Sequence, residues 1–236
     1  MSEEEKPRQV RLKVELSAHT PKPELVVALA ARTCYSDKEL ALSTKELSPQ
    51  LAGQIITKVV QRGHLSVLEH AVFTFSVDGL SRAASHQLVR HRIASYSQQS
   101  QRYVEFKGLE YVLPPTVAGK KELCGEFERF LAEAYKLYRR LVDSGLPRED
   151  ARFVLPNACA TKLIITMNAR ELLHVFNLRL CSRAQWEIRE LANRMLALCY
   201  KVAPTIFSIA GPGCRRGPCP EGDMTCGVKW VSPWEK

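Results

Sequence analysis

Alternating apolar and polar residues near the start of the chain predict a β-strand. In QVRLKVELSA (9–18), apolar residues alternate with charged ones, which predicts a strand with one buried face. The apolar spacing becomes that of a helix in PELVVALAARTC (23–34), which opens with proline. A second helix is expected over SPQLAGQIITKVVQRG (48–63), with Ser48 as its N-cap and Gly63 at its end.

The middle of the chain combines a central strand with a helix and a polar segment. AVFTFSV (71–77) is rich in β-branched and aromatic residues, which predicts a strand, and Asp78-Gly79 is expected to turn the chain. Ser81 is expected to cap a helix that runs to about His91. The polar residues that follow are expected to form a loop.

The second half of the chain has three helical patterns and one strand pattern. Residues 122–144 have the apolar spacing of a long amphipathic helix. TKLIITMN (161–168) predicts a strand, and Asn168 with Glu171 resembles a capping box that opens the helix ARELLHVFNLRL. A last helix, AQWEIRELANRMLALCYKV, is expected to end at Pro204.

These segments predict an α+β fold, because strands and helices do not alternate regularly enough for a doubly wound sheet. No linker or repeat interrupts them, so one domain is expected over residues 1–210. Residues 211–236 are rich in cysteine, glycine and proline and are expected to form a separate C-terminal tail.

Composition narrows the function classes. The chain has 236 residues, of which 45% are hydrophobic and 25% charged, and this is enough for one large soluble domain. Its net charge of +9 favours an anionic partner. MSEEEKPRQ is too acidic for a signal or transit peptide, and no apolar run approaches the length of a membrane span. A cytoplasmic protein with reduced cysteines is therefore expected.

The most unusual segment is basic and contains no acid. From Gly79 to Val104 there is no Asp, Glu or Lys, but there are four Arg and two His, most of them in VRHRIASYSQQSQRY (89–103). A guanidinium presents a planar set of donors that matches phosphate oxygens. A solvated basic face is the alternative, but such faces usually contain Lys. We therefore expect an anion site.

The kind of anion is limited by what the sequence lacks. No G-x-G-x-x-G follows a strand and no G-x-x-x-x-G-K-[ST] occurs, so side chains would have to hold a nucleotide. Gln87, Gln98 and Gln99 offer amides for a base or a flavin ring. The rival hypothesis is a basic, cysteine-knuckled nucleic-acid-binding protein, but only Tyr96 and Tyr103 lie near the cluster for stacking.

RHRIASYSQQSQRY contains Arg-His-Arg, seven residues and then Ser100, and resembles the signature of the flavin-dependent thymidylate synthases. RGHLSVLEHAVFTFSV, DARFVLPNA, MNARELLHVFNLRL and AQWEIRELA also resemble that family, in the same order, over roughly residues 25–210. The resemblance implies a mixed, largely antiparallel central sheet flanked by long helices. It also implies a homotetramer whose active sites form between subunits.

The resemblance implies a methyltransferase that converts dUMP to dTMP for thymidylate synthesis. The implied cofactor is FAD, with NADPH and 5,10-methylenetetrahydrofolate as co-substrates, and no membrane or nucleic-acid partner is expected. The implied FAD contacts are Ser66, Arg90, His91, Arg92, Gln98, Asn168, Ala169, Arg170 and His174. The implied dUMP contacts are Gln87, Leu88, Val89, Arg90, Gln98, Gln99, Ser100, Gln101, Arg102, Arg152 and Arg179. Arg152 would come from another subunit.

Arg179 is the residue to which the resemblance assigns catalysis. Carbon transfer builds negative charge on the carbonyl and N3 edge of uracil, and a fixed guanidinium would stabilise it. The alternative is an arginine that meets the C-terminal dipole of its helix. For Ser100, a hydroxyl that donates to phosphate is favoured over a nucleophile, because it has Arg90 and Arg102 on either side.

Several details depart from the family or stay open. Some members have Glu at the position of Gln98 and others have Asn at the position of His174. His64 is interpreted as a pocket residue and His70 as structural. The spacing H-x-x-x-x-E-H does not match zinc proteases, and no metal ligand is assigned in the active site.

The tail contains Cys214, Cys219 and Cys226 at a C-x4-C-x6-C spacing among glycines and prolines. This spacing fits zinc or iron–sulfur ligation, with Cys181 as a possible fourth thiolate, or equally a tail of free thiols. The remaining cysteines have apolar or helical surroundings and are expected in the core. They are Cys34, Cys124, Cys159 and Cys199.

Overall fold

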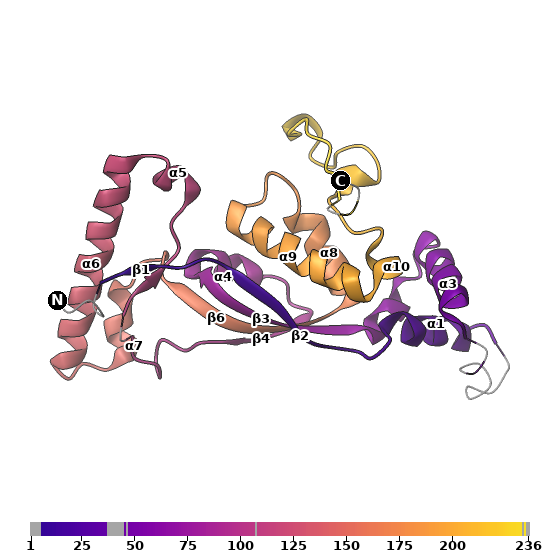
Figure 1. Cartoon of the computed structure of the whole chain (residues 1–236), viewed down its shortest axis with the longest axis horizontal. Coiled ribbons are helices and arrows are strands. Elements are labelled where there is room, and N and C mark those ends of the chain that lie inside the picture. Colours follow the sequence, from indigo (N-terminus) through magenta and orange to yellow (C-terminus); the bar gives the residue numbers. More distant parts are fainter. Residues whose placement is uncertain (1–5, 37–44, 46, 107, 233, 235–236) are drawn as a thin grey trace. The chain divides into compact units, whose positions relative to one another are not determined.

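The computed structural model describes residues 6–36, 45, 47–106, 108–232 and 234 (Figure 1). The strands are β1 (Arg8–Gln9), β2 (Lys13–His19), β3 (Val72–Ser81), β4 (Ala94–Gln98), β5 (Glu110–Tyr111) and β6 (Ala160–Asn168). The α-helices are α1 (Pro23–Thr33), α3 (Pro49–Gln61), α4 (Arg82–Leu88), α5 (Pro115–Ala118), α6 (Lys121–Asp143), α7 (Arg148–Ala151), α8 (Ala169–Arg179), α9 (Trp186–Val202) and α10 (Pro204–Phe207). Short 3-10 helices are η2 (Leu65–His70), η3 (Arg152–Val154), η4 (Gly213–Arg215) and η5 (Gly222–Met224). Part of MSEEEKPRQ, residues 1–5, lies outside the described residues.

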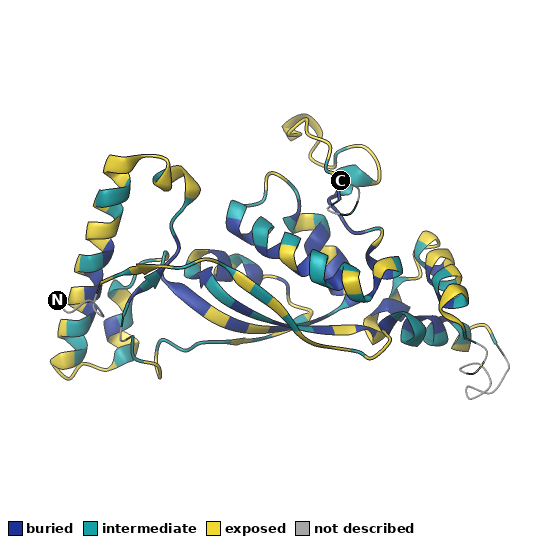
Figure 2. Ribbon diagram, viewed as in Figure 1, coloured by how far each residue is buried: buried dark blue, intermediate teal, exposed yellow. Residues whose placement is uncertain are grey.

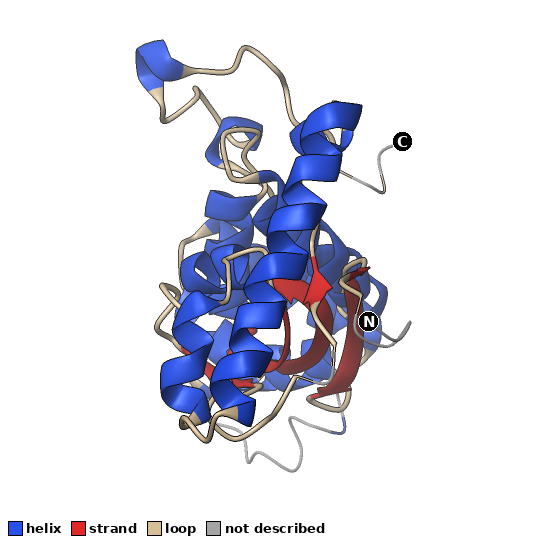
Figure 3. Cartoon of the chain, turned by 90° about the vertical axis from the view of Figure 1, so that its left-hand side faces the viewer, coloured by secondary structure: helices blue, strands red, loops and turns tan. Residues whose placement is uncertain are grey.

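Four strands form the main sheet, in the order β2-β3-β6-β4, and it is antiparallel. The short strands β1 and β5 pair in parallel, with Arg8 opposite Glu110. Helices and strands are mixed along the chain (Figure 3), which confirms the predicted α+β class. Within the described residues, no helix is both long enough and apolar enough to cross a membrane.

The contacts divide the described residues into two compact units. Unit 1 comprises Met1–Lys13, Val77–Arg90 and Ser97–Ile164, and unit 2 comprises Val14–Ser76, His91–Tyr96 and Ile165–Lys236. Each unit is made of three segments that alternate along the chain with those of the other. The residues just before and just after position 211, the predicted domain boundary, both belong to unit 2. The boundary between a domain over 1–210 and a tail over 211–236 stays a prediction.

The core of unit 2 is built from aromatic side chains and helix faces. The rings of Phe73 and Phe207 lie 5.4 Å apart and those of Phe176 and Phe207 5.9 Å apart, all fully buried. Helix α8 packs on η2 and α9, and α1 packs on α3. These helices alternate buried and exposed faces (Figure 2), as amphipathic helices do. The helix that carries the candidate active site is therefore fixed by packing on several sides.

The core of unit 1 forms along one face of α6. Leu131, Tyr135 and Tyr138 are buried there with Leu109 and Tyr111. The helix, Lys121–Asp143, agrees within one residue with the predicted segment 122–144, and Gly145 lies just past its C-cap Ser144 with φ +85°. The apolar spacing of that segment predicted the helix and the burial of Leu131. It was wrong for Leu123, Phe130 and Leu137, which are exposed, because the buried face is centred instead on Tyr135 and Tyr138.

Three predicted helix starts are confirmed by their caps. Ser48 Oγ accepts from the backbone N–H of Leu51, at 3.2 Å. In the same way Ser81 Oγ accepts from Ala84 N at 3.0 Å, and Asn168 Oδ1 accepts from Glu171 N at 2.9 Å. Each bond satisfies a donor that the first helical turn leaves open.

Two predicted elements around β3 and β4 are wrong. The chain does not turn at Asp78-Gly79, because β3 continues through these residues to Ser81. The helix that begins after Ser81 ends at Leu88 instead of near His91, and the expected polar loop contains β4. Strand β4 is the last in the sheet order, and an edge strand can carry the hydroxyl and amide side chains that suggested a loop.

The first predicted strand and two cysteines also need correction. QVRLKVELSA contains parts of two strands, β1 and β2, and its alternating apolar residues are only half-buried. Cys159 and Cys199 are buried as expected, but Cys34 is exposed and Cys124 is half-buried. Cys34 lies just past the end of α1, at its C-cap, where the helix no longer packs the side chain inward.

Candidate active site

Helix α8 positions most of the functional side chains in unit 2. Asn168 caps it, Arg170 and Glu171 lie in its first turn, His174 in the next turn, and Arg179 at its last residue. The start of a helix presents unpaired N–H groups and a partial positive charge, which favour an anion. The sequence therefore places donors at one end of α8 and a guanidinium at the other.

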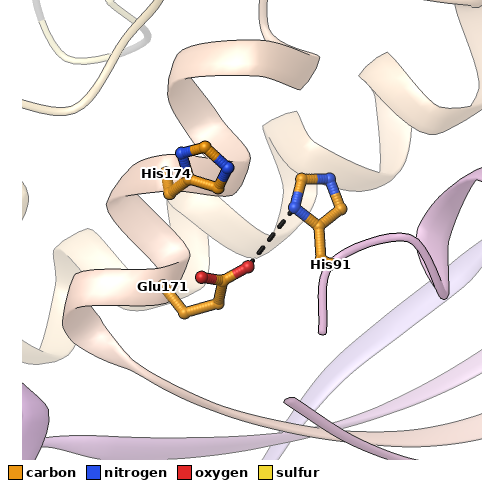
Figure 4. Close-up of side chains that lie close together, drawn as sticks. All are labelled: His91, Glu171 and His174. Carbon is orange, nitrogen blue, oxygen red and sulfur yellow. Dashed lines mark ion pairs between the residues drawn. The ribbon is translucent and has the colours of Figure 1, made fainter. Parts of the chain in front are cut away.

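A buried histidine links the two ends of this helix. His91 is 4% exposed, and its Nδ1 lies 3.4 Å from Glu171 Oε1 (Figure 4). Arg179 Nε donates to His91 Nε2 at 2.9 Å. Because Nε2 accepts this bond, the ring proton of the neutral imidazole is on Nδ1 and faces the carboxylate. The result is a chain of polar contacts from Glu171 through His91 to Arg179.

The charges around His91 keep it neutral. Burial, with the positive charge of Arg179 and the proximity of His174, lowers the pKa of His91 to about 4. Burial raises the pKa of Glu171, and His174 acts against that rise. Burial also raises the pKa of Tyr96, whose hydroxyl donates to the backbone oxygen of His91 at 2.9 Å. A neutral imidazole accepts from Arg179 without repelling it, so it orients the guanidinium.

His91, Glu171 and His174 also place their ligand atoms within 4.8 Å of one another. This is the spacing of a metal site, but Nε2 of His91 already accepts from a permanent cation. A divalent ion would be repelled by Arg179. The cluster is better described as the support of that arginine.

A cavity of about 530 Å³ in unit 2 is lined by the start of α8. Asn168, Arg170 and His174 contribute to its wall, together with Asn177 and Arg216. Arg170 Nη1 donates to Glu69 Oε1 at 2.6 Å, and Arg216 Nη2 donates to Asn177 Oδ1 at 3.0 Å. Both guanidiniums keep further donors, so the wall suits a ligand that carries phosphate.

The remaining implied FAD contacts of unit 2 lie at different depths. Ser66 is exposed in η2, which contributes Leu65 to the cavity wall. Ala169 is fully buried, so only its backbone can meet a ligand, and Arg92 is exposed. The structure thus brings Asn168, Arg170 and His174 to one cavity and leaves Arg92 outside its lining.

Two of the implied nucleotide contacts, Gln98 and Gln99, lie at the end of β4, where hydrogen bonds fix their orientation. Gln98 Nε2 donates to Ser85 Oγ at 3.1 Å and to Thr161 Oγ1 at 3.2 Å. The backbone oxygen of Gln99 accepts from Arg82 Nη2 at 2.7 Å. These bonds leave the amide oxygen of Gln98 available as an acceptor.

Ser100 and the residues near it differ in how accessible their polar groups are to an anionic ligand. Ser100 Oγ accepts from the backbone N–H of Arg102 at 3.1 Å, so its hydroxyl proton is available to a ligand. The other implied nucleotide contacts in this part of unit 1 differ in exposure. Leu88 is buried, Gln87 and Gln101 are half-buried, and Val89 and Arg90 are exposed.

The basic segment 79–104 contains no acid in its sequence, but the folded chain brings an acid from elsewhere next to it. Arg102 Nε pairs with Glu149 Oε2 at 2.9 Å, and Arg152 Nε donates to the backbone oxygen of Glu149 at 3.1 Å. Among the described residues, Arg90 and Arg92 have no ion-pair partner. The expectation of four guanidiniums without acidic neighbours is therefore wrong for Arg102.

Sequence reasoning missed several groups of these sites. Glu171 was interpreted only as a capping residue, and Glu149, Asn177 and Arg216 had no assigned role. A carboxylate on the inward face of an otherwise apolar helix is a signal that could have marked Glu171. Glu149 and Arg216 carry no such local signal, because charged residues in loops and short helices are common.

Both the sequence and the fold of this chain resemble those of known proteins. Residues 15–205 match the family model described as thymidylate synthase complementing protein. A flavin-dependent thymidylate synthase from Geobacter sulfurreducens is 58% identical, over 92% of this chain and 94% of its own length. One from Clostridium tetani is 45% identical, over 92% of this chain and 93% of its own length. A similar fold occurs in the crystal structure of PolB, a UMP/dUMP methylase from Streptomyces cacaoi bound with 5-Br dUMP. Its TM-score is 0.76 at 26% identity, and the match covers 86% of this chain and 95% of that chain.

Proposed function

This chain belongs to the thymidylate synthase complementing protein family. On that premise we propose how its residues bind the substrate and the flavin and methylate dUMP. It is a flavin-dependent thymidylate synthase, an enzyme that methylates dUMP to dTMP. The observation that carries the assignment is the 58% identity to a flavin-dependent thymidylate synthase over 92% of the chain.

The flavin is FAD, and the unit 2 cavity suits it. Arg170 and Arg216 supply guanidinium donors for phosphate, and the start of α8 adds its backbone N–H groups. His174 also lines the cavity. The other contacts are proposed from the family resemblance alone, because none of them is in the lining of this cavity: Ser66, Arg90, His91, Arg92, Gln98 and Ala169. Bound FAD supplies hydride transfer, with NADPH as the source of electrons and 5,10-methylenetetrahydrofolate as the one-carbon donor.

The nucleotide is held by the polar segment of unit 1. The hydroxyl of Ser100, whose oxygen already accepts from the backbone of Arg102, donates to the phosphate of dUMP, and Arg90 and Arg102 supply guanidinium donors to the same phosphate. Gln87, Leu88, Val89, Gln98, Gln99 and Gln101 line the rest of the pocket. Arg152 joins from another subunit of a homotetramer, and the enzyme works in the cytoplasm.

Arg179 stabilises the negative charge that develops on the uracil ring during carbon transfer. Its Nε is held by neutral His91, which in turn faces Glu171. The orientation of the guanidinium is therefore set before the substrate binds, which is the arrangement that makes a fixed charge effective. Arg179 is the proposed catalytic residue, and Glu171 is a positioning residue.

The nucleic-acid alternative has no support from the relatives. A stacking platform needs an exposed aromatic face. Of the two tyrosines near the basic segment, Tyr96 is half-buried and its hydroxyl is bonded to the backbone of His91, so only Tyr103, which is 74% exposed, offers such a face.

The test is an assay of the purified protein with each reactant omitted in turn. The protein is expected to bind FAD, to be yellow, and to form dTMP from dUMP only when NADPH and methylenetetrahydrofolate are both present. Product is measured by chromatography. A colourless protein that rejects added FAD and forms no dTMP would contradict the proposal.

A further inference from the structure

Four cysteines line one cavity at the C-terminal end of unit 2. Its volume is about 240 Å³, and the cysteines are Cys181, Cys214, Cys219 and Cys226. Cys181 follows α8, whereas the other three come from the segment after α10. Cys214, the first of them, lies 33 positions after Cys181, so only the folded chain brings the four together. The reaction proposed above uses none of these thiols.

The segment that carries three of these cysteines is folded tightly on itself. A Cβ on Gly211, which has φ +148°, would lie 2.8 Å from Arg215 Cδ and 2.9 Å from Trp230 Cζ3. A Cβ on Gly213 would lie 2.8 Å from Pro220 Cγ. Because no side chain fits at either position, the glycines permit this close packing.

Contacts to the helical part of unit 2 hold the segment in place. Arg183 Nη1 donates to the backbone oxygen of Met224 at 2.7 Å and pairs with Glu221 Oε2 at 3.2 Å. Arg216 Nη2 donates to Asn177 Oδ1 on α8 at 3.0 Å. Glu221 and Met224 lie between Cys219 and Cys226 in the sequence. These contacts therefore fix the loop that presents two of the four sulfurs.

We propose that Cys181, Cys214, Cys219 and Cys226 are the four thiolate ligands of a metal centre. Thiolates bind zinc and iron–sulfur clusters, and four of them complete the ligand shell of either. Arg183, Arg189 and Glu221 also line the cavity. Because Glu221 pairs with Arg183, the charge of Arg189 is the one that offsets the negative charge of a four-thiolate centre. Leu180, Val228 and Trp230 form the apolar part of the wall, and Val228 is 65% exposed, so the cavity is open to solvent there.

The spacing of the sulfurs favours an iron–sulfur cluster as the occupant. Four thiolates around one zinc ion at 2.3 Å would lie about 3.8 Å from one another. Among the described residues, the side chains whose ligand atoms are already grouped as around a single ion are His91, Glu171 and His174, and the four cysteines do not form such a group. In a cluster, iron and sulfide occupy the space between the thiolates, so the ligands stand farther apart around a larger cavity.

The experiment measures metal in the full-length protein purified without oxygen. Iron, zinc and acid-labile sulfide are determined per chain, before and after incubation with ferrous iron and sulfide. We expect about two or four iron atoms with matching sulfide. FAD absorbs in the same spectral region, so the cluster is followed by low-temperature electron paramagnetic resonance after reduction.

The matched variants separate this site from adventitious binding. The double variant Cys214→Ser/Cys219→Ser is expected to contain at least about tenfold less iron per chain than the wild type. The control variant Cys34→Ser, which changes an exposed thiol outside the cavity, is expected to keep its iron. If the double variant does not fold, the site is tested instead by the iron content of the single variant Cys226→Ser and of the wild type. Wild type without stoichiometric metal, or variants that keep it, would overturn the site. One zinc ion per chain, lost in the same variants, would support the four-cysteine site and overturn the cluster.

Discussion

Arg179 shows how the candidate chemistry depends on the surroundings of a single side chain. At the end of a helix, an arginine commonly meets the helix dipole and solvent. Here its Nε donates to a buried imidazole that faces a buried carboxylate. The remaining guanidinium nitrogens are therefore held in one orientation, which is what stabilisation of a developing charge requires.

Arg179→Ala is expected to lower the rate of dTMP formation by roughly 100- to 1,000-fold, because it removes a fixed charge from the transition state. FAD binding, followed by absorbance, is expected to remain. Arg129→Ala, at an exposed arginine of α6, serves as the control and should keep the wild-type rate. Normal turnover by the Arg179 variant would remove this residue from the mechanism.

His91 is expected to stay neutral in the folded protein down to a pH of about 4, because its pKa is lowered to that value. The unfolded chain takes up this proton near pH 6.5, so between pH 6.5 and 4 the unfolded state binds more protons. The histidine therefore makes the free energy of unfolding fall, by roughly 3 kcal/mol in all, as the pH decreases through this window.

Protonation of Glu171 acts in the opposite direction, because its pKa is raised. His91 is therefore best followed directly, by nuclear magnetic resonance of its ring nitrogens. A neutral ring with its proton on Nδ1 at pH 6 is expected. Titration of His91 near pH 6.5 would show that Arg179 and burial do not control it.

At the scale of elements, β3 shows where local sequence rules fail. Asp-Gly is a common turn signal, yet Gly79 lies within β3 with φ +71°. A Cβ there would lie 2.5 Å from the backbone oxygen of Arg11, which is far too close. The glycine serves a close approach of two backbone segments in unit 1 instead of a reversal of the chain.

Gly79→Ala is expected to destabilise the protein by more than Gly63→Ala. Both glycines have positive φ, which costs a residue with a Cβ about 1–2 kcal/mol, but a Cβ on Gly63 would meet nothing within 4 Å. The contact with Arg11 should add roughly 1–3 kcal/mol at Gly79. Chemical denaturation measures both. Equal losses would show that the backbone at Arg11 moves away without cost.

At the scale of the whole molecule, the proposed homotetramer places Arg152 and Arg179 in one active site from different subunits. Arg152 is half-buried and donates to the backbone of Glu149, which also pairs with Arg102. This arrangement groups the two arginines around Glu149 in unit 1, with Arg102 on its carboxylate and Arg152 on its backbone oxygen. It is consistent with a basic site that a second chain completes.

Mixing two inactive variants tests this assembly. Arg152→Ala and Arg179→Ala are each expected to be nearly inactive. If each site takes these residues from different subunits, randomly mixed tetramers should regain about a quarter of the wild-type activity. The variants are dissociated, mixed and reassembled before the dTMP assay. Absence of any recovery, with tetramers formed, would place both residues in the same subunit.

The amino-acid sequence by itself determined the elements whose signals are local. The apolar spacing of α6 and α9 and the caps Ser48, Ser81 and Asn168 depend on residues within one or two turns. The motifs likewise supplied the residue types of the candidate site. A backbone preference or a helix periodicity is decided over such short distances.

Only the tertiary structure decided which charged groups meet. Glu149 pairs with Arg102 across 47 residues of sequence, and Arg179 reaches His91 across 88. The same holds for Gly79 against Arg11 and for Cys181 beside the tail cysteines. Contacts of this kind form only when packing of the core brings distant segments together, and no local preference encodes them.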